Sequence, residues 1–145
     1  MGAGKSSYVK DKNPVVATDE IRKELFNNVD DISQEKFIFD TSIERIVDLF
    51  KTHDTVYFDA TMVETKHRIT FLEEIKKLVK DIELIGIIFT VDPEVAKERI
   101  QSDIDSGVDR ASSVHFVDEY YQYFKETMDL IKDNKVLFTP IFYKK

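Results

Sequence analysis

The stretch IELIGIIFTVDP, residues 82–93, decides the fold that we expect. Residues 82–91 are almost continuously apolar, which is typical of a strand buried on both faces of a parallel sheet. Asp92 and Pro93 then indicate a helix start, because aspartate accepts from free backbone N–H groups and proline suits the first helical position. A buried strand that leads directly into a helix is the repeating unit of a parallel α/β sheet, so we expect 82–91 to be the most deeply buried strand.

The same alternation of strands and helices extends along the whole chain. Further short strands are expected at 15–17, 56–58 and 136–138. Helices are expected at about 6–12, 18–26, 33–51, 65–79, 93–104 and 112–132. The sequence therefore predicts one α/β domain, residues 1–145, with a parallel sheet between two layers of helices.

Two of the expected helices carry a clear apolar stripe that should face the core. The first stripe consists of Phe37, Ile38, Ile43, Ile46, Val47 and Phe50. The second consists of Ile69, Leu72, Ile75, Leu78 and Val79. The helix at 18–26 is expected to be capped by Thr18 and Asp19.

Composition limits the classes of function. With 42% hydrophobic residues and eleven Phe, the 145-residue chain can bury a substantial core. The formal net charge of −7 argues against a broad surface for duplex nucleic acid, although not against a local pocket for one phosphate-bearing end. The chain has no cysteine, which excludes disulfides and thiolate metal sites and fits a reducing cytosol. No apolar run approaches the roughly 20 residues of a membrane span, so we expect a cytoplasmic protein.

The N-terminal residues MGAGKSS contain the end of a phosphate-binding loop, G-x-x-x-x-G-K-[ST]. In such a loop the lysine, here Lys5, contacts the β- and γ-phosphates, and the hydroxyl, here Ser6, binds Mg²⁺. The first glycine of the motif would precede Met1, and the leading strand is missing as well. An in-frame strand and glycine encoded just upstream of the Met1 codon would supply both. For this chain we expect weak binding of ATP.

Two acidic motifs follow expected strands. In ATDEIR, Asp19 comes after the strand at 15–17 and could accept a proton from an attacking hydroxyl, with Arg22 one turn further on the same side. The alternative is that Asp19 only caps its helix. In VYFDAT, Asp59 ends the strand at 56–58 and could orient magnesium or bond a substrate hydroxyl. Its alternative is an ordinary loop aspartate or helix cap.

These motifs occur in a fixed order: GAGKSS, ATDEIRKELF, VYFDATMVETKHRITFLEEIKK and VDPEVAKERIQSD. In this order, over nearly the whole chain, they resemble the P-loop kinases of the polynucleotide kinase-like group and the small AAA-domain ATP-binding kinases beside it. The resemblance implies a three-layer P-loop NTPase-type sheet with helices on both faces, here without its first strand. It also implies ATP and Mg²⁺ as cofactors. The implied reaction transfers the γ-phosphoryl group to a hydroxyl acceptor: a 5′-hydroxyl polynucleotide, a nucleoside or a related small molecule.

The resemblance also implies roles for individual residues. Asp19 would be the general base, and Arg22, Asp59 and Thr61 would bind the acceptor. Arg110, in a lid at about 103–113, would stabilise the transferring group, with Arg99 just before the lid. The ATP-binding residues would be Gly2, Ala3, Gly4, Lys5, Ser6 and Ser7, with Lys5 also catalytic and Ser6 the magnesium ligand.

The chain departs from that group at the missing first strand and at the lid. The lid sequence, IQSDIDSGVDRASS, is acidic where the group's lid is usually basic. Two alternatives therefore stay open: a degenerate nucleotide-binding or interaction protein without turnover, and a toxin-like kinase of a sugar nucleotide. A neighbouring chain that completes the sheet, and so a homo-oligomer, also stays open. The aromatic cluster Phe116, Tyr120, Tyr121, Tyr123 and Phe124 could pack in the core or stack a base.

Overall fold

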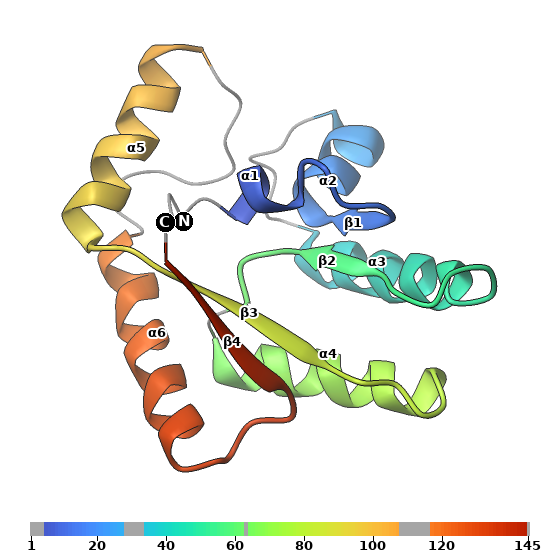
Figure 1. Cartoon of the computed structure of the whole chain (residues 1–145). Helices are drawn as coiled ribbons and strands as arrows, with labels where there is room; N and C mark the ends of the chain where they lie inside the picture. Colours follow the sequence, from blue (N-terminus) through green and yellow to red (C-terminus); the bar gives the residue numbers. More distant parts are fainter. Residues whose placement is uncertain (1–4, 28–33, 63, 108–116, 145) are drawn as a thin grey trace.

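The computed structural model describes residues 5–27, 34–62, 64–107 and 117–144, without the side chains of Ser6 and Lys144. Helices and strands alternate along this part of the chain, so the predicted α/β class is confirmed (Figure 1). The helices are α1 (Lys5–Val9), α2 (Thr18–Phe26), α3 (Glu35–Leu49), α4 (Thr65–Leu78), α5 (Pro93–Asp105) and α6 (Val117–Lys132). The strands are β1 (Val15–Ala17), β2 (Tyr57–Asp59), β3 (Ile85–Thr90) and β4 (Thr139–Lys144). None of the described helices has the length and apolar character needed to cross a membrane.

The strands form two separate parallel pairs, which corrects the expectation of one continuous sheet. In the first pair β1 lies beside β2, and in the second β3 lies beside β4. Figure 1 shows β2 and β3 running in the same general direction but apart from each other. Strands must lie about 4.8 Å apart to share backbone hydrogen bonds. Within the described ranges no strand lies between β2 and β3 to join the pairs.

The main core surrounds the β1–β2 pair. Its buried members come from β1, α2, α3 and α4, namely Val16, Ile21, Ile38, Ile46, Phe71 and Ile75. Phe58 of β2 stacks on Phe71 of α4, with ring centroids 4.7 Å apart. Each of these elements therefore turns its apolar side toward the same two short strands.

The β3–β4 pair is much more open, so the expectation that 82–91 is the most buried strand is wrong. No residue of β3 is buried, and Ile85 is 53% exposed. The helices that follow β3 bury Ala96 and Ile100 of α5 and Val117 of α6 in a second cluster, against which Val91 packs. On one face of the pair, Tyr8 of α1 packs against Phe89 and Tyr143.

The apolar stripes are confirmed in part. Ile38, Ile46 and Ile75 are buried as predicted, whereas Phe37 is 53% exposed and Leu78 is 51% exposed. Phe37 instead contacts Phe26 of α2 edge to face, with ring centroids 6.1 Å apart. Position along the helix does not explain the exposure of Phe37, because the neighbouring Ile38 is completely buried; the two side chains point to different sides of α3.

Beta strand β4 lies outside the expected range. We expected 136–138, but the strand spans Thr139–Lys144 and contains Pro140 opposite Gly86. Proline lacks an N–H donor, so it is tolerated in an edge strand, and among the described residues β4 pairs with β3 alone. Phe138 instead lies over Gly86, where there is no Cβ to block its ring.

The two expected helix caps have different outcomes. The cap of α5 is confirmed, since the Asp92 side chain accepts from the backbone N–H of Glu94 at 2.9 Å. The cap of α2 is not: Ala17 is the N-cap residue and makes no side-chain cap bond. Thr18 and Asp19 lie in the first turn instead, which leaves the Asp19 carboxylate for other contacts.

Candidate functional site

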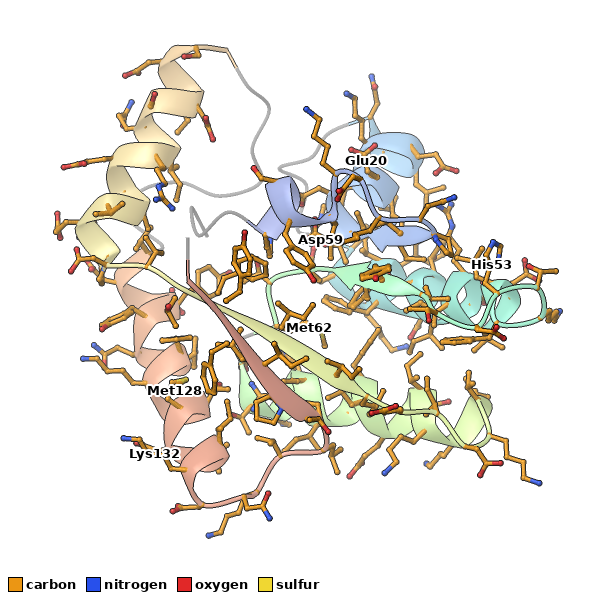
Figure 2. The ribbon with its side chains drawn as sticks, in the orientation of Figure 1. Glu20, His53, Asp59, Met62, Met128 and Lys132 are labelled. Carbon is orange, nitrogen blue, oxygen red and sulfur yellow. The ribbon has the colours of Figure 1, made fainter. Side chains whose placement is uncertain are left out.

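The two acidic motifs meet at one end of the β1–β2 pair. Register places Ala17, the last residue of β1, opposite Asp59, the last residue of β2. Asp19 follows two residues after Ala17, at the start of α2. Figure 2 shows Asp59 where β2 ends, close to α1 and α2. Ligands of open α/β sheets bind at such carboxyl ends of parallel strands.

Helix α1 brings Lys5 to the same end. Lys5 Nζ lies 3.3 Å from Asp59 Oδ1, and the two side chains are 31% and 11% exposed. A largely buried carboxylate requires such a partner, because desolvation of an unpaired charge is costly. The structure therefore joins the lysine of the first motif to the aspartate of the third.

Arg22 is the second buried charge of the site, and its side chain is 8% exposed. Its Nη1 donates to Asp19 Oδ1 at 2.7 Å. The predicted placement of Asp19 and Arg22 on one side of α2 is confirmed. The cap interpretation of Asp19 is wrong, because its carboxylate holds Arg22 and not the free N–H groups of the helix.

Glu35, in the first turn of α3, is a member of this group that the motifs did not reveal. Arg22 Nε donates to Glu35 Oε1 at 2.8 Å, and Arg22 Nη2 lies 2.6 Å from the same oxygen. Glu35 follows Arg22 by 13 residues and lies on another helix. Neither helical spacing nor a motif connects the two positions, so only the packing of α3 on α2 brings them together.

One tyrosine of α6, Tyr120, lies within the electrostatic reach of Glu35 and Arg22, whereas the raised pKa of its neighbour Tyr123 has causes outside this group. Burial raises the pKa of Tyr120, and the carboxylates of Glu119, Glu35 and Glu64 raise it further, while Arg22 acts in the opposite direction. For Tyr123 the charge of Glu64 is the main cause of its raised pKa. Both phenols therefore stay neutral and can act as hydrogen-bond donors.

Several predicted site residues have partial or no description. Gly2, Ala3, Gly4, Arg110 and lid residues 108–113 lie outside the described residues, as does Phe116 of the aromatic cluster. For Ser6 only the backbone, in α1, is described; Ser7 is exposed and Thr61 is half-buried, two residues after β2. The first residues of the expected lid, 103–105, belong to α5, and Arg99 lies exposed on the same helix.

Metal binding by side chains alone has no support in the described part of the chain. There, no group of three or more His, Asp or Glu side chains could hold a metal ion. His53 lies beyond the opposite end of β2 from Asp59 (Figure 2). A magnesium ion that arrives with nucleotide phosphates needs fewer protein ligands, and one carboxylate or hydroxyl is an ordinary contribution. The Asp59 carboxylate could supply such an oxygen ligand to magnesium. The role of the Ser6 hydroxyl as a magnesium ligand stays a prediction.

A comparison with models of known protein families gives no match, and neither does a comparison with curated proteins. The function is therefore inferred from the site itself and from its motifs.

Proposed function

We propose that this protein is an ATP-dependent kinase that transfers the γ-phosphoryl group to a hydroxyl acceptor. One observation carries the proposal: Lys5 contacts Asp59 at the strand end where Asp19 and Arg22 also lie. Three separate sequence motifs thus supply charged groups at the carboxyl end of the β1–β2 pair. They are the ammonium of Lys5, the carboxylate of Asp59 and the carboxylate of Asp19, which Arg22 holds. Phosphoryl transfer needs these parts, because its catalysis is mostly positioning and charge neutralisation.

The proposed nucleotide side of the site contains Lys5 and Asp59. Lys5 would offset the phosphate charge, and its contact with Asp59 holds the ammonium at the strand end. Ser6 and Asp59 would hold a nucleotide-borne magnesium ion, which neutralises charge on the phosphates when bound. The other proposed loop residues are Gly2, Ala3, Gly4 and Ser7.

The proposed acceptor side contains Asp19 as general base. Its side chain is 53% exposed, so an acceptor hydroxyl can approach it. Oδ1 accepts from Arg22, which leaves Oδ2 to receive the proton. Arg22, Asp59 and Thr61 would bind the acceptor, and Arg110 would act from the lid.

The proposal includes a finer fold class and a compartment. The β1–β2 and β3–β4 pairs, both parallel, fit the outer parts of a three-layer P-loop-type sheet. The absence of cysteine fits the reducing cytoplasm.

The test is phosphoryl transfer from γ-labelled ATP to 5′-hydroxyl oligonucleotides, nucleosides and sugar nucleotides. We expect a labelled product with at least one acceptor, and a loss of about 10²- to 10⁴-fold in Asp19→Asn. Asp40→Asn is the matched control, because Asp40 is an exposed helical aspartate paired with Lys36. The absence of product with every acceptor, or equal rates for Asp19→Asn and the wild type, would contradict the proposal.

A nucleotide-binding protein without turnover is the second candidate. The acidic lid sequence favours it, because a lid without several cations gives little stabilisation to a transferring phosphoryl group. Calorimetry with ATP and Mg²⁺ separates the two: binding that Lys5→Ala abolishes, without product in the acceptor panel, would support this candidate.

A further inference from the structure

The hydrogen bonds of Arg22 are distributed unevenly over its guanidinium group. A guanidinium has five N–H donors. Glu35 Oε1 accepts from Nε and lies 2.6 Å from Nη2 as an ion-pair contact, and Asp19 Oδ1 accepts from Nη1. At least one N–H therefore remains on each terminal nitrogen. The Nε and Nη2 atoms of Arg22 thus face Glu35 of α3. Its Nη1 atom faces Asp19.

Glu35 has the features of a group that aims this arginine. It contacts two of the three guanidinium nitrogens at 2.8 and 2.6 Å, and charged hydrogen bonds of this length are strong. The Arg22 side chain is 8% exposed, so water competes little with Glu35 for the N–H donors on Nε and Nη2. Asp19 alone holds only Nη1 and would allow the guanidinium plane to turn about that single bond.

We propose that Glu35 is a positioning residue: it holds Arg22 in the orientation that serves both Asp19 and the acceptor. The proposal rests on the proposed kinase function for its effect on catalysis, but not for the geometry itself. Glu35 does not touch the acceptor in this scheme; it acts through Arg22. Without its charge, Arg22 turns, the Asp19 carboxylate loses its fixed orientation, and the two remaining terminal N–H groups no longer point together.

A purely structural role for Glu35 would be to tie α3 to α2, and the chain offers a matched control for it. Glu24 of α2 and Arg45 of α3 make a two-bonded ion pair between the same helices, at 2.9 and 3.0 Å. Glu24 lies two residues after Arg22 and so faces another side of α2. Glu24→Gln therefore weakens the α2–α3 contact without touching Arg22.

The experiment compares steady-state kinetics of Glu35→Gln and Glu24→Gln. Glutamine keeps the shape of glutamate but not its charge. For Glu35→Gln we expect kcat/KM for the acceptor to fall about 10- to 100-fold, from the loss of charged hydrogen bonds, with KM for ATP unchanged. Glu24→Gln should stay within about twofold of the wild type. Equal acceptor kinetics in the two variants would overturn the proposal, and so would an equal rise of KM for ATP and for the acceptor.

A second measurement does not need activity. In a ¹⁵N-labelled chain, the Arg22 Nε–H signal, assigned through Arg22→Lys, should exchange slowly with water in the wild type and in Glu24→Gln. Glu35→Gln should lose that protection, and retained protection would overturn the positioning role. If the wild type phosphorylates no acceptor, the proposed function fails while this measurement still decides whether Glu35 holds Arg22. If Glu35→Gln unfolds at the assay temperature, Glu35→Asp replaces it with the same expectation, since aspartate cannot span both nitrogens from the same backbone position.

Discussion

The two strand pairs of this protein differ in a way that their sequences do not suggest. The β1–β2 pair has three residues in each strand, yet it is packed against a core from three helices. The β3–β4 pair has six residues in each strand and the more apolar sequence, yet no residue of β3 is buried. The shorter, more polar pair is thus the better covered one.

The difference teaches that helices, not strand hydropathy, decide how deeply a strand is buried. Helices α2, α3 and α4 each direct apolar residues at β1 and β2. The helices near β3 bury Ala96, Ile100 and Val117 in a cluster of their own. The candidate site follows the same division, because its charged residues gather at the well-packed pair: Lys5, Asp19, Arg22, Glu35 and Asp59.

The largest expected effect tests this division with one aromatic residue from each region. Phe71 is 6% exposed and stacks on Phe58, whereas Phe142 is 53% exposed. We expect Phe71→Ala to lower the free energy of unfolding by about 3–5 kcal/mol, because it removes buried contacts and leaves a cavity. Phe142→Ala should change it by less than about 0.5 kcal/mol. Urea unfolding followed by far-UV circular dichroism measures both values.

Equal losses in these two variants would break the comparison. They would show that β4 is covered in solution as well as β2 is. A loss for Phe142→Ala that depends on protein concentration would point to self-association through β4.

An intermediate effect is expected inside the open pair, where Gly86 allows one close contact. A Cβ at this position would overlap the ring of Phe138. We expect Gly86→Ala to lower the unfolding free energy by about 1–3 kcal/mol, the usual range for overpacking. The double variant Gly86→Ala with Phe138→Leu should recover part of the loss. If Gly86→Ala is neutral in thermal unfolding, the Phe138 ring moves aside freely and the pair has no tight contact there.

The smallest expected effect concerns pH and the α2–α3 contact beside the well-packed pair. The hydrogen bond and the charge of Arg45 hold the pKa of Glu24 below its ordinary value of 4.5. Since the folded pKa is the lower one, the contribution of this pair is fully present above pH 4.5 and is lost as the pH falls through the folded value. Unfolding measured from about pH 6 to about pH 3 should therefore show a shallower acid loss in Glu24→Gln. Identical slopes in the variant and the wild type would contradict the expectation.

The features that were predicted correctly are those controlled by neighbouring residues. Asp92 and Pro93 define the start of α5, and the β-branched runs locate β1 and β2 within one residue. What was missed depends on distant partners. The strand that contains Pro140 pairs with β3, from which α5 and α6 separate it in the chain. The buried Arg68 donates from its Nη1 to the hydroxyl of Thr127 of α6, 59 residues away, at 2.9 Å.

The sequence by itself determined the alternation of helices and strands and the residue types of the candidate site. Both follow from propensities, caps and periodicity, which act over a few residues. Tertiary structure alone decided that the strands form two pairs, that Lys5 meets Asp59, and that Glu35 holds Arg22. These outcomes depend on which helix covers which strand. That choice is made by the packing of whole apolar faces, and no short stretch of sequence contains it.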